Sequence, residues 1–110
     1  MAKNLQLTQS VTIASSGTTS TSITMEGGRT VLAIRTPASL DGTAFTFQAS
    51  DDGDNFYNLY NGGTQYSVNV GTSRYVALSP DVMFGVRHLK IVSGSTETAS
   101  RSIKVISGEV

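Results

Sequence analysis

The residues best suited to chemistry lie in one acidic segment, Asp51-Asp52-Gly53-Asp54-Asn55, which stands between aromatic residues. Its carboxylates suggest either a calcium loop or an acid–base pair. Calcium loops space their acids and close with a later bidentate carboxylate, whereas no acid follows here until Asp81. Acid–base catalysis needs a carboxyl group whose pKa is raised in a cleft. Because Asp-Gly is a strong hairpin signal, we predict a turn between two strands.

The remaining candidates for catalysis are few. His88 is the only histidine, and the chain has no cysteine. A thiol nucleophile, a disulfide and a thiolate metal site are therefore excluded. Period-two alternation places His88 on the face opposite Leu89, so we expect an exposed or interface side chain. We predict a protein that is not an enzyme, with no catalytic, cofactor-binding or metal-binding residue and no cofactor.

Tyrosine and arginine side chains point instead to contact surfaces. The tyrosines allow two interpretations: an aromatic platform that binds sugar, or half-buried sheet faces that keep the hydroxyl in water. We favour the second. Arginines outnumber the three lysines, and arginine is enriched at protein interfaces. These residues are Tyr57, Tyr60, Tyr66 and Tyr75, with Arg29, Arg35, Arg74, Arg87 and Arg101.

Length and charge limit the function classes. The 110 residues suffice for one modest core, and hence for one domain. Eight basic and eight acidic residues give a net charge of zero, so there is no electrostatic footprint for nucleic acid or an anionic membrane. The N-terminus lacks the apolar core of a signal peptide, and no segment reaches the ~20 apolar residues of a membrane helix. We expect synthesis without secretion through that route.

The elements that would position these residues are short strands. Clusters of β-branched and aromatic residues recur about every ten residues, separated by Gly, Pro and Asp turns. Turns are expected at Glu26–Arg29, Asp41-Gly42 and Gly62-Gly63, and one helical turn at Pro80–Phe84 with Ser79 as its cap. The predicted strands are Ser10–Ala14, Ser20–Met25, Thr30–Arg35, Thr43–Ser50, Asn55–Tyr60, Gln65–Val70, Tyr75–Leu78, Val86–Val92 and Arg101–Ile106.

This pattern of eight or nine short strands predicts an all-β protein, an antiparallel sandwich or barrel. Residues 18–110 would form a single sandwich domain, preceded by residues 1–17 as an N-terminal arm or first edge strand. That segment is polar, with an apolar cluster of Leu5, Leu7, Val11 and Ile13. We expect it to lie on a neighbouring molecule or to pair with an edge strand.

Two segments, FTFQASDDGDNFYNLYNGG and SRYVALSPDVMFGVRHLKIVSG, carry a family likeness. Over roughly residues 30–107 the chain resembles small β-sandwich proteins of tailed-phage virions. Its strand pattern is also similar to that of galactose-binding, discoidin-like domains, whose turn tryptophan this chain lacks. The matching positions are Phe47, Gln48, Ser50, Asp52, Gly53, Phe56, Tyr57, Leu59, Tyr60, Leu78, Pro80, Phe84, Gly85, Arg87, Leu89, Ile91, Ser93 and Gly94.

The resemblance implies an antiparallel jelly-roll-like β-sandwich of about eight strands. It also implies a capsid decoration, or cement, protein of a bacteriophage. Such a structural protein binds the major capsid protein and neighbouring copies of itself, stabilises the head and binds neither nucleic acid nor membrane. It would be made in the bacterial host cytoplasm and located on the capsid surface of the virion. The alternative is a carbohydrate-binding or adaptor module of a tail fibre or baseplate, which would use the loops near Tyr57–Tyr66 and Arg74.

Overall fold

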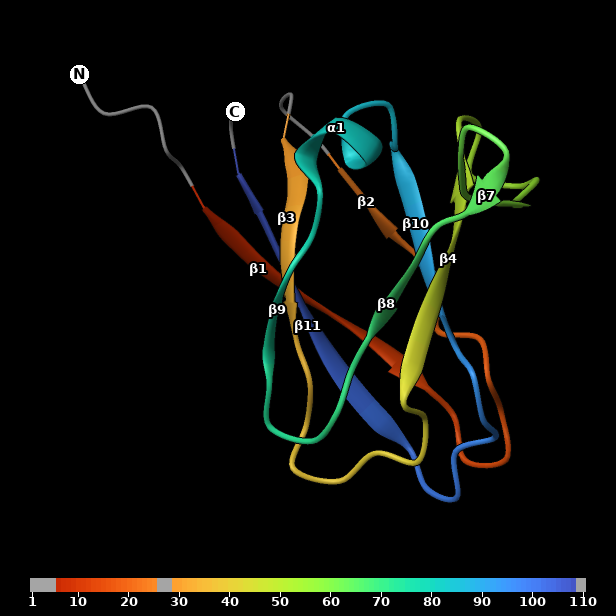
Figure 1. Cartoon of the computed structure of the whole chain (residues 1–110), viewed down its shortest axis with the longest axis vertical. Coiled ribbons are helices and arrows are strands. Elements are labelled where there is room, and N and C mark those ends of the chain that lie inside the picture. Colours follow the sequence, from red (N-terminus) through yellow and green to blue (C-terminus); the bar gives the residue numbers. More distant parts are fainter. Residues whose placement is uncertain (1–5, 26–28, 109–110) are drawn as a thin grey trace.

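The computed structural model describes residues 6–25 and 29–108, and its regular elements are nearly all strands (Figure 1). The expected turn at Glu26–Arg29 therefore lies largely outside the described residues. Within these described residues the one helix is α1, Pro80–Met83. The strands are β1 Leu7–Ile13, β2 Ile23–Thr24, β3 Thr30–Arg35, β4 Ala44–Ser50, β5 Tyr57–Asn58, β6 Tyr60–Asn61, β7 Thr64–Gln65, β8 Ser67–Asn69, β9 Tyr75–Ala77, β10 His88–Ser93 and β11 Arg101–Gly108.

The strands form two principal antiparallel sheets. The four-stranded sheet has the order β1-β11-β3-β9. The five-stranded sheet has the order β2-β10-β4, and both β5 and β8 pair with β4 along its remaining edge. This is the strand arrangement of a jelly roll, so the predicted fold class is confirmed. The described residues form eleven strands rather than about eight, because β5, β6 and β7 lie in the connection between β4 and β8.

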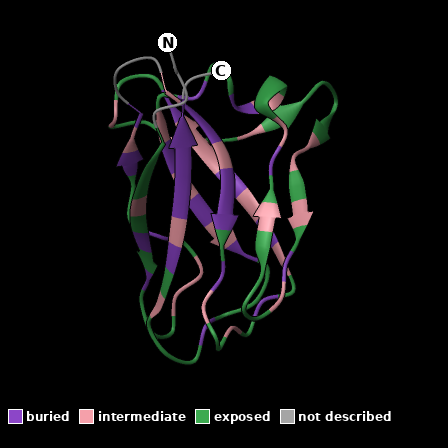
Figure 2. Cartoon of the chain, turned by 90° about the vertical axis from the view of Figure 1, so that its left-hand side faces the viewer, coloured by how far each residue is buried: buried purple, intermediate pink, exposed green. Residues whose placement is uncertain are grey.

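The core lies between the two sheets and follows the period-two pattern. Phe45, Phe47, Leu89 and Ile91 are fully buried on the inner face of the five-stranded sheet. They face the inner residues of the other sheet, namely Val11, Ile13, Ile34, Ile103 and Val105. Figure 2 shows that buried positions lie mainly on the strands, whereas the connecting loops are largely exposed. Burial of this alternating apolar set is the main force that holds the sheets together.

Several local predictions need correction. The expected strand Asn55–Tyr60 is divided into β5 and β6 at Leu59, whose N–H donates to the carbonyl oxygen of Phe47 at 2.9 Å. The expected strand Gln65–Val70 is likewise divided at Tyr66. Ser79 precedes the predicted helical turn, but its side chain makes no capping hydrogen bond. The turn at Gly62-Gly63 is confirmed, since it joins β6 to β7 with Gly62 at a φ of 66°.

The two ends of the sandwich are built differently. At one end, which we call the hairpin end, lie α1, the β6–β7 hairpin and the acidic turn at residues 51–55 (Figure 1). At the other, which we call the network end, lie the connections β1–β2, β3–β4, β8–β9 and β10–β11. Among the described residues, no helix is long and apolar enough to span a bilayer.

Candidate functional site

The acidic segment is a turn stabilised by its own side chains. Ser50, the last residue of β4, accepts hydrogen bonds at its Oγ from the N–H groups of Asp52 (3.2 Å) and Gly53 (2.9 Å). Asp52 Oδ1 accepts from the N–H groups of Asp54 (2.8 Å) and Asn55 (2.9 Å). Gly53 takes a φ of 83°, which favours glycine. The prediction of a turn between two strands is confirmed, because β4 pairs with β5 across this connection.

The same hydrogen bonds set the electrostatics of the turn. The N–H of Asn55, followed by that of Asp54, lowers the pKa of Asp52 well below its usual value. A carboxylate held ionised in this way cannot serve as a general acid near neutral pH. Among residues 6–25 and 29–108, no group of three or more His, Asp or Glu side chains is arranged to hold a metal ion.

His88 lies on the outer face of the five-stranded sheet and is half-buried. Its Nδ1 is 2.9 Å from the hydroxyl oxygen of Thr24 on the neighbouring strand β2. Its ring also covers Gly53, where an added Cβ would lie 3.4 Å from two ring atoms. The histidine therefore packs the acidic turn against the sheet, rather than standing free in solvent as one of the sequence alternatives suggested. Nearby on the same strand, Lys90 Nζ stands 4.3 Å from the centre of the Phe56 ring.

The tyrosines take two different roles. Tyr66 belongs to the core boundary: its ring centroid is 5.6 Å from that of Phe47, and its hydroxyl accepts the N–H of Ser79 at 3.0 Å. Tyr57, Tyr60 and Tyr75 are 68%, 54% and 64% exposed. The interpretation of half-buried tyrosines therefore holds for Tyr66 and fails for the other three.

Arg74 is not brought to the tyrosine loops. Its backbone is bonded to Thr36 just beyond β3, with Arg74 N–H donating to Thr36 Oγ1 at 2.8 Å. It therefore lies at the network end, whereas Tyr57 is opposite Ala49 near the far end of β4 (Figure 1). A site that combines Arg74 with Tyr57–Tyr66 does not form within one chain.

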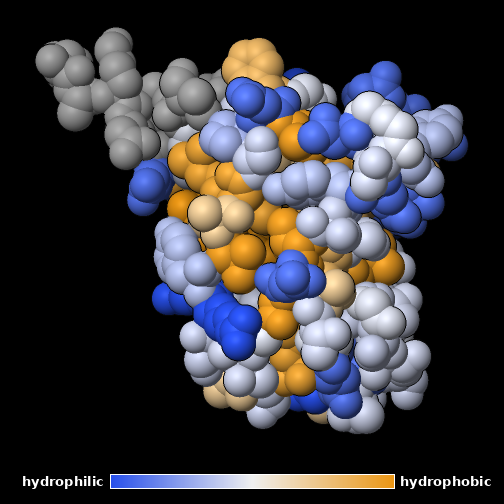
Figure 3. Space-filling model, in the orientation of Figure 1, coloured by the Kyte–Doolittle hydropathy of each residue, from blue (hydrophilic) through white to orange (hydrophobic). Residues whose placement is uncertain are grey.

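Several exposed aromatic residues lie at the hairpin end. Tyr57 pairs with Ala49, and the adjacent Ser50 pairs with His88 at the start of β10. Phe84, just after α1 and shortly before β10, is 74% exposed. Figure 3 shows a further apolar strip between β9 and β8, where Val76 and Val68 are only partly buried. Large exposed aromatic residues are enriched at protein interfaces.

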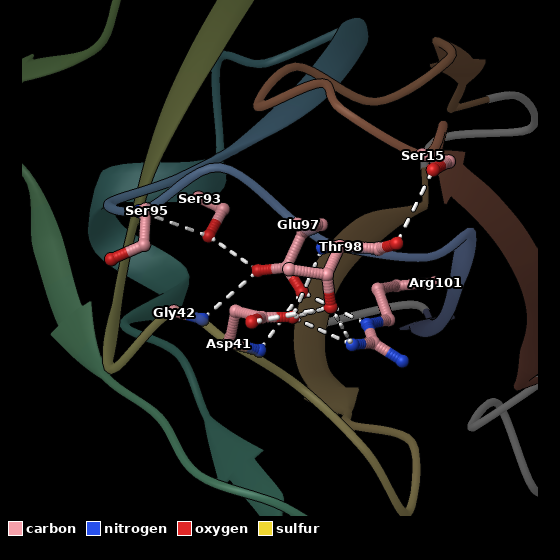
Figure 4. Close-up of polar contacts among 8 residues, drawn as sticks. All are labelled: Ser15, Asp41, Gly42, Ser93, Ser95, Glu97, Thr98 and Arg101. Atoms are coloured by element: carbon pink, nitrogen blue, oxygen red, sulfur yellow. Dashed lines mark hydrogen bonds and ion pairs between the residues drawn. The ribbon is translucent and has the colours of Figure 1, made fainter.

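The network end holds a buried carboxylate that the sequence did not reveal. The side chain of Glu97 is fully buried in the β10–β11 connection. Its oxygens accept four hydrogen bonds: from the N–H groups of Asp41 and Gly42 (both 2.9 Å), Ser93 Oγ (2.8 Å) and Arg101 Nε (3.0 Å) (Figure 4). Arg101 also forms an ion pair with Asp41 at 2.6 Å. We call these five residues the Glu97 network.

The network is built to hold charge rather than to transfer protons. Burial raises the pKa of Glu97, but the four donors outweigh burial and bring this pKa below its usual value. The hydrogen bond from Arg101 is the main cause that lowers the pKa of Asp41 to about 2. The backbone of Glu97 also bonds Ser16 and Gly17 in the β1–β2 connection. The network thus joins three connections and has a structural role.

Comparison with known proteins does not assign the chain to a family. No model of a known protein family matches the chain, and a search of the curated proteins finds no relative. The functional argument therefore rests on the surfaces of the molecule, above all on the exposed aromatic residues of the hairpin end.

Proposed function

We propose that this protein is a phage capsid decoration protein that binds the major capsid protein and stabilises the head. The observation that carries the proposal is the exposure of Tyr57, Tyr60 and Phe84 at one end of a jelly roll. Exposed aromatic residues supply large contact area and are typical anchors of protein interfaces. The resemblance of residues 30–107 to virion β-sandwich proteins supports the same role.

The mechanism is adhesion without chemistry. A decoration protein bridges neighbouring capsomers, and the buried contact area opposes their separation. Weak single contacts suffice, because attachment at several points raises the effective concentration of each. Hydroxyl side chains on the outer face of the four-stranded sheet, those of Thr8, Ser10, Thr12 and Ser102, are exposed. They offer hydrogen bonds to a neighbour without making the free protein strongly apolar.

The test is co-sedimentation with DNA-free capsids of the phage that encodes this chain, after the decoration protein has been stripped from them. Phe84→Ser and Tyr57→Ser should each weaken binding by about tenfold or more, as expected for an interface anchor. The matched control is Tyr75→Ser, because Tyr75 is equally exposed but lies toward the network end, opposite Arg35. Failure of the unmodified protein to pellet with these capsids would refute the proposal.

A second candidate function is carbohydrate binding by a tail-fibre or baseplate module. Tyr57 and Tyr60 favour it, because both rings are exposed on the short strands β5 and β6. Exposed aromatic faces are groups on which a sugar ring can stack. A glycan array separates the two functions: binding lost in Tyr60→Ser, together with no capsid binding, would favour the carbohydrate role.

A further inference from the structure

The edge strand β1 differs from every other sheet edge among the described residues. The other edge strands, β2, β5, β8 and β9, contain two or three residues each, whereas β1 contains seven. Short edges are one of the devices that prevent pairing with another chain. β1 itself also lacks the charges, prolines and bulges that protect other edges. It contains no charged residue and no proline, and its register with β11 runs from Leu7 to Ile13 without a bulge.

The chain protects only one half of this edge. At Thr12 the N–H donates to Thr21 Oγ1 at 3.0 Å, and the carbonyl oxygen accepts the N–H of Thr21 at 2.9 Å. The backbone groups of Thr12 therefore point away from β11. Because alternate residues of a strand direct these groups to the same side, Thr8 and Ser10 point outward too. Within the described part of the chain, no hydrogen bond to their backbone groups is recorded.

We propose that β1 is a self-association edge, through which two copies of this chain pair antiparallel about a two-fold axis at Gln9. In this register Thr8 of one copy faces Ser10 of the other, and each such pair exchanges two N–H···O bonds. The four open donors and four open acceptors of the two copies then form four hydrogen bonds. Pairing stops at Thr12, whose outward groups are already bonded to Thr21.

A second copy fits this edge better than a charged or irregular partner strand does. Thr8 and Ser10, whose backbone groups point outward, lie on either side of Gln9. The edge is therefore complementary to itself, as an isologous interface requires. The strand Leu7–Ile13 itself carries no charge, and Lys104 of the neighbouring strand β11 donates to Ser10 Oγ at 2.8 Å. Leu7 alternates with the buried Val11 and Ile13 and yet is 39% exposed. In the proposed register the paired strand of the second copy lies beside it.

The pairing joins two four-stranded sheets into one continuous eight-stranded sheet. It goes beyond the proposed capsid role and does not depend on it, because it follows from backbone groups alone. Where the capsid role also holds, a dimer carries two hairpin ends and gains the benefit of two-point attachment.

Sedimentation analysis of the full chain over a wide concentration range tests the proposal. We expect a reversible monomer–dimer equilibrium, with amide exchange at Thr8 and Ser10 slowing as the dimer forms. Thr8→Pro removes an outward N–H but no bond to β11. Each dimer then loses two of four hydrogen bonds, so the dissociation constant should rise at least about 30-fold.

A second substitution keeps the test decisive if the proline variant does not fold. Thr8→Lys places a charge on the open edge, the device that natural edges use against pairing, and should also weaken the dimer. The matched control is Ser102→Lys, which puts the same charge on the same sheet face but on the interior strand β11. A monomer at every concentration, or a dimer that neither Thr8 variant weakens, would overturn the proposal.

Discussion

Replacing Glu97 by glutamine removes one charge from the Glu97 network while keeping the size of the side chain. Glutamine retains one oxygen and presents an NH2 group in place of the other. If the oxygen keeps the Oε1 position, it still accepts from Asp41 and Arg101. The NH2 group then faces the N–H of Gly42 and the hydroxyl of Ser93. The hydroxyl can rotate to accept, but the buried Gly42 N–H loses its acceptor.

The expected loss follows from these contacts. An unsatisfied buried N–H costs about 1–3 kcal/mol, and a neutral bond to Arg101 is about 1 kcal/mol weaker than a charged one. Glu97→Gln should therefore lower the free energy of unfolding by about 2–4 kcal/mol. For a domain of this size the melting temperature should fall by roughly 10–20 °C.

The assay is urea unfolding followed by circular dichroism, in which the midpoint should fall while the slope stays unchanged. The control is Asp51→Asn, because Asp51 is an exposed carboxylate with no recorded side-chain bond in the described part of the chain. It should change stability by less than about 0.5 kcal/mol. If Glu97→Gln is as mild as this control, the structural role assigned to the network is wrong.

Three further predictions concern the core and the Glu97 network. Phe47→Ala, which empties a fully buried position, should cost about 3–5 kcal/mol in urea unfolding; a loss under about 1 kcal/mol would place Phe47 outside the core. Gly42→Ala should unfold at clearly lower temperature, because its Cβ would overlap Ser93 Oγ; an unchanged melting temperature would contradict the close packing. Folding lowers the pKa of Asp41 from 3.8 to about 2. The stabilising contribution of its carboxylate to the free energy of unfolding is therefore complete above the unfolded pKa, and it is lost as the pH falls toward 2. The urea unfolding midpoint should decline as the pH is lowered from 3.8 toward 2. A midpoint that does not change with pH would contradict a stabilising ion pair at Asp41.

The strands and their inner faces could be predicted from sequence because alternation is local. In the predicted strand Thr43–Ser50, alternation places Phe45 and Phe47 on one face, and both are fully buried. Thr30–Arg35 was predicted with its observed bounds. Hydrophobic period two and turn residues act within a few neighbours, so a single sequence carries them. The division of Asn55–Tyr60 could not be predicted, since it depends on a bond from Leu59 to Phe47 in another strand.

The Glu97 network could not be predicted for the same physical reason. Glu97 lies in a polar Ser/Thr/Gly connection, where a glutamate is normally solvated. Its donors come from Asp41 and Gly42, which are 56 and 55 residues away along the chain. No local pattern signals such a contact. The exposure of Tyr57 was also unexpected, because the predicted strand Asn55–Tyr60 is interrupted at Leu59 and Tyr57 lies on a two-residue edge strand.

The position of β11 constrains how the chain is made. This strand lies between β1 and β3 in the middle of its sheet, yet it follows both of them, and every other described strand, along the chain. β1 has no partner within its sheet until Arg101–Gly108 has been synthesised, so the sheet cannot close before that strand emerges from the ribosome. We expect chains truncated before Arg101 to lack the strand that joins β1 to β3 and to expose open edges on both, which favours aggregation.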